Sequence, residues 1–464
     1  MMARLSTLAA LTAIHWLSAV PLAAQCGPAD SPANSCAVIA NKELIISEPC
    51  VVDDVWRTRW DTPGAPAKAN GAWTFGKLMA SLAGYEHIDV NPLGLSNFVR
   101  FWLDHFRTTF EINGFTVASR DGLGSVSDFI ADWEAVSGCG AGGVLDMKLA
   151  PFRLLAIVNR LDLRRGNGTI PIAGGEGRFV FGALDIDVKD KDPADWSPLN
   201  FTVIMEYRLL ADDCADILAW ADAWHTLSSY NFADHTGRYN AWLQGITDAF
   251  AGYKADSSAL NGSALAQLRT NENAFDFPTE LREFRLQADP YGTVFLVQTT
   301  VAQTPDNSLK GTQALADYLE DDVLAIIRRE HVVPAVHNGN PLLGGSSLNQ
   351  GIAWTAPDFD CTDARANFAI NTCNGCHQIE THINLFHIPP RFAGQESVLS
   401  TFLTGTSDCS SIPDQGCGLF PDTGMVLRRF NEKQRRADDL CDLLTASCAG
   451  KSIFRTPNRA STVH

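Results

Sequence analysis

Positive charge is scarce in this chain of 464 residues. Lys and Arg number 36 against 53 Asp and Glu, which gives a formal net charge of −17 at pH 7. Nucleic acids and anionic membrane surfaces repel such an acidic protein, so neither is an expected partner. Charged residues make up only 19% of the chain and apolar residues 45%, so most of it should fold into globular structure.

Several catalytic signatures are missing from the sequence. It contains no G-x-S-x-G, H-E-x-x-H or P-loop pattern, and neither an internal repeat nor a low-complexity tract. Hydrolase and nucleotide-dependent activities therefore have no support. Beyond the first 24 residues, no apolar run has the uninterrupted length of a transmembrane helix.

The N-terminus has the features of a secretory signal peptide. Arg4 provides a positive charge, Leu5–Val20 is almost wholly apolar or small, and Pro21–Ala24 offers a small-residue cleavage site. A retained membrane anchor is the alternative, because the apolar stretch is nearly long enough to span a bilayer. We expect residues 1–24 to be removed and the mature bacterial protein to be periplasmic or secreted, without membrane insertion.

The segment Asn371–His377 carries a C-x-x-C-H motif formed by Cys373, Cys376 and His377. This spacing attaches c-type haem: two thiolates one helical turn apart add to the haem vinyl groups, and the adjacent imidazole binds the iron. With 12 Cys and 11 His in 464 residues, chance alone gives roughly 0.007 such motifs per chain. Haem attachment on the exported side of bacterial membranes agrees with the leader.

Ten further cysteines indicate disulfides, because an even remainder in an exported chain favours pairing. Buried free thiols are the alternative for any given pair. The close pairs are the simplest assignment: Cys26 with Cys36, Cys409 with Cys417, and Cys441 with Cys448.

The hydrophobic pattern predicts an N-terminal α+β domain over residues 25–330, with a mainly antiparallel sheet because strands cluster rather than alternate with helices. Residues 331–357 are rich in Gly, Ser and Pro and predict a linker. The expected strands are Phe152–Val158, Arg178–Leu184, Phe201–Tyr207, Leu281–Leu286 and Thr293–Val301. The expected helices are Trp73–Ala83, Ser96–Phe110, Ser125–Val136, Cys214–Leu227, Tyr239–Ala251 and Gly311–Arg329.

Residues 358–464 predict a small all-α haem domain. A helix over Thr362–Thr372, the C-x-x-C-H motif, a long loop and a closing helix over Phe430–Leu444 follow one another. This order resembles small class I c-type cytochromes across residues 358–451. The resemblance implies that Phe368 packs against the last helix and that the Pro390 carbonyl accepts the N–H of His377.

The sixth iron ligand has more than one candidate. The resemblance places a methionine just before the closing helix, where Met425 stands. His387 and His382 lie closer to the motif and would give bis-imidazole ligation. Alternatively, Cys373, Cys376, His382 and His387 form a possible zinc ligand set, although zinc does not require a histidine directly after the second cysteine.

The sequence thus predicts an exported protein with one covalent haem c that transfers electrons, with a redox partner protein of basic surface. One alternative is a haem-dependent oxidoreductase, peroxidase-like, with its pocket between the domains. Another is a binding protein with structural zinc or an ancillary haem. If the haem serves the large domain, residues of Arg269–Glu283 or Gly311–Arg329 should contact it. The polar groups of Arg269–Asn273 and Glu280–Arg285 predict either a pocket lining or a salt-bridge network.

Overall fold

The computed structural model describes residues 26–122, 125–167, 170–232, 237–359, 362–381, 383, 385–405, 430–448 and 453. The expected signal peptide, Met425, His382 and the predicted pair Cys409/Cys417 lie outside the described residues.

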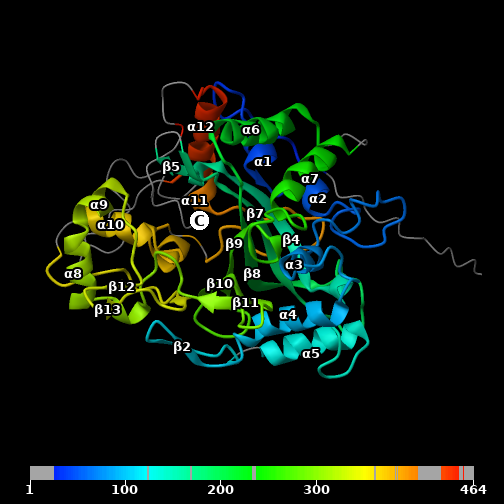
Figure 1. The fold of residues 1–464 in the computed structure, drawn as a ribbon, viewed down its shortest axis with the longest axis horizontal. Helices are drawn as coiled ribbons and strands as arrows, with labels where there is room; N and C mark the ends of the chain where they lie inside the picture. Colours follow the sequence, from blue (N-terminus) through cyan, green and yellow to red (C-terminus); the bar gives the residue numbers. More distant parts are fainter. Residues whose placement is uncertain are drawn as a thin grey trace, which may run out of the picture.

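One antiparallel sheet forms the centre of the described structure (Figure 1). Its strand order is β1-β4-β7-β8-β9-β10-β11, and β14 also pairs with β10, making eight strands within the described residues. The mixed α+β class with a mainly antiparallel sheet is confirmed. The strands are β1 (Ile45–Ile46), β4 (Phe152–Arg160), β7 (Glu176–Asp185), β8 (Ser197–Arg208), β9 (Leu265–Glu272), β10 (Glu280–Ala288), β11 (Val294–Thr299) and β14 (Ser347–Leu348).

Strand β4 is buried along its whole length, because other elements cover both faces of the sheet. Strand β9 was not predicted: its sequence LAQLRTNE carries polar groups that a sequence pattern assigns to a loop. Those polar side chains are nevertheless buried, since β9 lies between β8 and β10 in the middle of the sheet.

Helices α3 (Phe75–Leu82), α4 (Pro92–Asp104) and α5 (Val126–Ser137) lie together on one side of the sheet (Figure 1). Their aromatic rings pack on those of the strands: Phe75 stacks on Phe152 at 4.0 Å between centroids. Helix α5 lies within the range predicted for it, and Ser125 caps it by accepting from the Asp128 N–H. Helix α4 starts earlier than predicted, because Asn91 rather than Ser96 is its N-cap.

The remaining elements surround this core. At its opposite end stand α1 (Ala40–Glu43), α2 (Pro49–Val52), α6 (Cys214–His225), α7 (Arg238–Ala251), α11 (Thr401–Thr404) and α12 (Glu432–Leu444). Small hairpins pair β2 (Phe110–Ile112) with β3 (Phe115–Val117), β5 (Arg165–Asn167) with β6 (Ile170–Ala173), and β12 (Val336–His337) with β13 (Asn340–Pro341). Single turns of 3-10 helix occupy Met147–Leu149, Leu161–Leu163, Thr226–Ser229, Leu260–Gly262 and Asn307–Leu309.

A second, smaller hydrophobic cluster joins α8 (Gln313–Asp321), α9 (Val323–Arg328) and α10 (Thr362–Ile370). Phe368 lies in this cluster against Tyr318 and Trp354, whereas Leu440 and Leu443 of α12 belong to the main core. The expected packing of Phe368 on the last helix is therefore wrong. A separate all-α cytochrome domain is not visible in the described residues, since the C-terminal segments are divided between two clusters.

Residues 331–357 differ from the predicted linker. They add β14 to the edge of β10, and they bury Trp354 to 1% exposure beneath α10. The Gly, Ser and Pro residues that predicted a linker lie in closely packed turns instead. Residues on both sides of the expected domain boundary at 357/358 thus share one small core.

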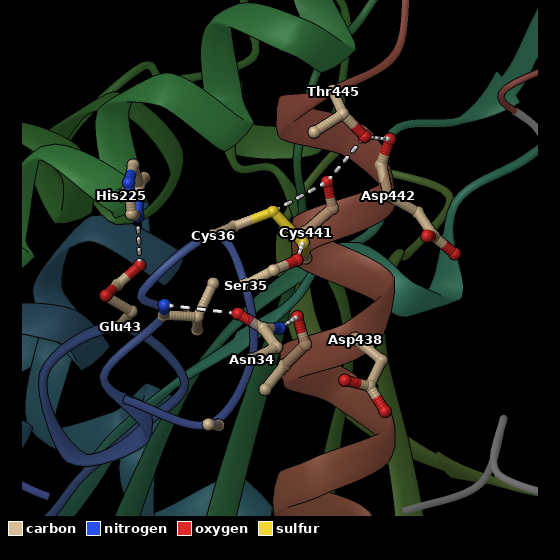
Figure 2. The surroundings of a disulfide bond; sticks show 12 residues. Asn34, Ser35, Cys36, Glu43, His225, Asp438, Cys441, Asp442 and Thr445 are labelled. Carbon is tan, nitrogen blue, oxygen red and sulfur yellow. Dashed lines mark hydrogen bonds and ion pairs between the residues drawn. A yellow bond between two sulfur atoms is a disulfide. The ribbon is translucent and has the colours of Figure 1, made fainter. Parts of the chain in front are cut away.

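Among the described residues, three disulfides connect separate parts of the chain: Cys26–Cys50, Cys36–Cys441 and Cys214–Cys448. The predicted pairs Cys26/Cys36 and Cys441/Cys448 are wrong, because the fold brings the two ends of the chain together and opens pairings that sequence distance conceals. Figure 2 shows how Cys36 ties the segment before α1 to α12, where the Asn34 amide also donates to the Ala437 carbonyl.

Removing the Cys36–Cys441 bond should destabilise the protein, because it closes a span of 405 residues in the unfolded chain. We expect Cys36→Ser with Cys441→Ser to lower the free energy of unfolding by about 2–5 kcal/mol in non-reducing denaturant titrations. Cys139→Ser is the matched control, since Cys139 is a free cysteine. Equal midpoints for the double variant and the control would contradict a disulfide at this position.

Candidate functional site

The C-x-x-C-H motif forms a turn directly after α10. Gly375–Ile379 winds as a π-helical turn, and Gly375 is required there because a Cβ would collide with the Ala369 carbonyl. The Trp354 indole N–H donates to Thr372 Oγ1 at 2.8 Å and to Asn374 Oδ1 at 2.9 Å. The second cluster therefore holds the start of the motif in place.

Both motif thiols are buried. Cys373 is 1% exposed and Cys376 0% exposed. Burial raises the pKa of the Cys373 thiol to about 11, with the Arg269 guanidinium opposing it, and burial also raises the pKa of Cys376 well above its usual value. In the folded chain both side chains are therefore neutral thiols at pH 7.

His377 is held in one tautomer by the backbone carbonyl of Leu385. Its Nδ1 lies 2.7 Å from that oxygen, so Nδ1 carries the proton and donates it. The Asn271 amide of β9 donates to the same carbonyl at 2.7 Å. Burial lowers the pKa of His377 to about 4, so the ring is neutral at pH 7 and Nε2 is its basic nitrogen.

The carbonyl that accepts from His377 is therefore that of Leu385 and not that of Pro390. Leu385 has a positive φ of 67°, a conformation that turns the chain back beneath the imidazole. Pro390 instead lies over β7, where it packs beside Gly182. Sequence reasoning could not find this bond, because any residue can supply a backbone carbonyl.

His387 faces the motif. Its ring centroid lies 4.5 Å from that of His377, and its Nε2 lies 3.4 Å from Cys376 Sγ. Ser400 Oγ contacts the other ring nitrogen, Nδ1, at 2.9 Å. Burial, together with the neighbouring His377, lowers the pKa of His387 well below its usual value. Of the sixth-ligand candidates, His387 is the one that lies within the described residues.

The zinc ligand set is not assembled in the described part of the chain. No group of three or more His, Cys, Asp or Glu side chains there is arranged to hold a metal ion. His382, the fourth member of that set, lies outside the described residues.

A cavity of about 70 Å³ lies between the motif and the sheet. The motif side contributes Cys373 and His377, and His387 lies beside them. Apolar residues line much of the rest: Ile45, Val158, Val180, Ile204, Leu281, Phe386, Ile388 and Leu403. The polar lining is Arg160, Arg178, Thr202, Arg269, Thr270, Asn271 and Arg436.

The cavity arginines belong to buried ion pairs. Arg178 reaches Glu206 at 3.2 Å, Arg269 reaches Glu283 at 3.2 Å, and Arg160 reaches Asp162 at 2.9 Å. The salt-bridge network predicted from Arg269 onward is confirmed, and the same residue also lines the cavity. The pocket lining and the salt-bridge network are therefore compatible, because a charged side chain of a strand can form an ion pair and still line a cavity.

The prediction that Arg269–Glu283 would lie near the motif agrees with this geometry, since Arg269, Asn271 and Leu281 line the cavity. Sequence reasoning missed Arg160, Arg178 and Arg436. A signal was present at the first two: each is a charged residue in an otherwise apolar strand, which requires a buried partner.

Comparisons with protein-family models, with curated proteins and with solved structures gave no match to this chain. Within the described residues no helix combines the length and the apolar character needed to cross a membrane. The three disulfides are compatible with a periplasmic or extracellular location.

The burial of the motif predicts its reactivity. In protein prepared without haem, iodoacetamide at pH 8 should modify Cys139, which is partly exposed, and spare Cys373 and Cys376 because both are buried and protonated. Peptide mapping by mass spectrometry measures each site separately. The same treatment in denaturant should modify all three, and rapid labelling of Cys376 in the native protein would contradict the structure.

Proposed function

We propose that this protein binds one haem c covalently through Cys373 and Cys376, with His377 Nε2 as the proximal iron ligand. The observation that carries the proposal is the geometry of the motif: Cys373 and His377 line a cavity of about 70 Å³, Cys376 is buried beside them, and the Leu385 carbonyl accepts from His377 Nδ1 and leaves Nε2 as the basic nitrogen. Bound there, the haem would supply one-electron chemistry, and the residues of the protein would orient it and set its environment.

The residues around the cavity suit a haem. The apolar lining favours the porphyrin face, and the guanidinium groups of Arg160, Arg178, Arg269 and Arg436 would attract its two carboxylates. The Leu385 carbonyl fixes the orientation of His377 and increases the basicity of Nε2. A buried position also limits water around the iron, which tunes its potential.

Electron transfer is the activity that we propose for this haem. It requires no substrate pocket beyond the haem cavity, and the formal net charge of −17 favours docking to a basic redox partner. The disulfides and the leader-like N-terminus support export to an oxidising compartment, where haem attachment takes place.

A second candidate is reduction of peroxide or a similar small ligand. The observation that favours it is the presence of His387 and two guanidinium groups, Arg160 and Arg436, around one cavity. A neutral imidazole can accept a proton and a guanidinium can stabilise developing negative charge. In this candidate His387 does not bind the iron.

Covalent attachment is tested by the motif cysteines. We expect Cys373→Ala with Cys376→Ala to abolish haem staining of the denatured chain, because both thioether bonds are lost. Cys139→Ser, which leaves the motif intact, should retain full staining. Stoichiometric zinc in the wild type, with no Soret absorption band, would refute the proposal.

The role of His387 separates the two candidates. If His387 is the sixth ligand, His387→Ala should allow the ferrous protein to bind carbon monoxide, and the wild type should not bind it. Met425→Ala is the matched comparison, and a gain of carbon monoxide binding there would assign the ligand to Met425. The second candidate holds if the wild-type protein binds carbon monoxide and if the His387→Ala variant turns over peroxide at least tenfold more slowly than the wild type.

A further inference from the structure

A second cleft opens at the beginning of β4, away from the haem motif. It has a volume of about 1,500 Å³, counted to its open mouth, and residues 52–63, 147–154 and 192–194 form most of its walls. Aromatic rings from three elements line it: Trp60, Trp73, Phe75 and Phe152. The proposal for the haem makes no use of this cleft.

Each carboxylate around the cleft forms an ion pair with a neighbouring cation. Lys148 Nζ lies 2.7 Å from Asp61 Oδ2, and Arg59 Nη1 lies 3.7 Å from Asp192 Oδ2. The third acidic residue, Asp53, is bound by Arg391 at 2.7 Å. These contacts neutralise every carboxylate that lines the cleft.

Arg153 is the cation beside the cleft that has no carboxylate in an ion pair with it among the described residues. Its side chain lines the cleft and is only 8% exposed, yet it forms no ion pair within the described part of the chain. Its guanidinium donates to backbone carbonyls instead: those of Arg391 at 2.9 Å, Pro193 at 2.8 Å, Ala194 at 3.0 Å and Trp196 at 3.3 Å. Carbonyl dipoles solvate the charge but do not neutralise it.

Around the cleft, the four cations Arg59, Lys148, Arg153 and Arg391 face three carboxylates, those of Asp53, Asp61 and Asp192, so one positive charge is in excess. Burial and the Arg391 guanidinium lower the pKa of Arg153 to about 10, although Asp53 and Asp192 oppose this shift, so the group remains charged at neutral pH. In a chain with a formal net charge of −17, this leaves a local positive site inside an acidic protein. An anion in the cleft would supply the missing counter-charge.

We propose that this cleft binds an organic monocarboxylate with an aromatic or aliphatic body. Arg153 attracts the carboxylate, and the aromatic walls bury the apolar body. A single negative charge fits because one cation is unmatched. A dianion such as phosphate would bring a second negative charge, for which the cleft has no unmatched cation.

The cleft is linked to the haem cavity by one segment of chain. His387 and Ile388 line the haem cavity, the Arg391 carbonyl accepts from Arg153, and Ala393 lines the cleft. The proposal for the carboxylate site does not depend on the haem, because its binding can be measured by heat in protein with or without the cofactor.

Isothermal titration calorimetry of the full-length mature protein with phenylacetate and hexanoate tests the site. We expect each carboxylate to bind at least tenfold more tightly than its neutral amide, phenylacetamide or hexanamide, because the amides lack the charge that Arg153 attracts. Arg153→Met should remove this preference and Arg153→Lys should retain most of it. Arg107→Gln is the matched control: it removes the same charge from an exposed ion pair with Asp104 outside the cleft, and should change binding less than threefold.

Filling the cleft gives a test that leaves the bonds of Arg153 intact. Val55 lines the cleft and is 41% exposed, so Val55→Trp should block it without unfolding the protein and reduce carboxylate binding at least tenfold. This variant decides the matter if Arg153→Met does not fold. The proposal is overturned if neither carboxylate binds, if the amides bind equally well, or if binding survives in Val55→Trp or in folded Arg153→Met.

Discussion

The buried charges on one face of the sheet constrain the rest of this structure. Arg178 stands opposite Glu206 in the β7–β8 register, and Arg269 stands opposite Glu283 in the β9–β10 register. Glu206 and Glu283 are both 0% exposed. Such groups are tolerated only when their partners are fixed and water is excluded, since an unpaired buried charge costs several kcal/mol. The face must therefore be covered by segments that bring matching charges.

The C-terminal segment provides this cover. Helix α12 brings Arg435 to Asp162 at 2.6 Å and Glu432 to Arg436 at 3.6 Å, which completes the network around Arg160. Asp439 of the same helix binds Arg164. Cys36–Cys441 and Cys214–Cys448 anchor the helix and the residues after it, so the covalent links and the ion pairs act on the same element. The C-x-x-C-H motif is enclosed because α12 is held in this way.

One short segment, residues 387–393, contributes to the walls of both cavities. Arg391 stabilises it by donating to the Leu154 carbonyl at 2.7 Å and by its ion pair with Asp53. The segment thus connects the wall of the cavity beside the C-x-x-C-H motif with the wall of the aromatic cleft. A ligand in the cleft would contact elements that also position His387, so a redox group and a carboxylate site could serve one activity.

Local patterns in the sequence determined the motif, the apolar strands β4, β7, β8, β10 and β11, and the position of helix α5, because each depends on residues close together in the chain. The polar strand β9 escaped prediction, since its neighbours β8 and β10 make it a strand. Tertiary structure alone decided the disulfide partners, the Leu385 carbonyl beneath His377, and the approach of His387 to Cys376. These contacts join residues whose proximity arises from packing against the sheet. The C-x-x-C-H spacing is encoded in five consecutive positions. The charged cavity beside the motif is formed by residues of β4, β7, β9 and α12, which are distant in sequence and meet only on folding.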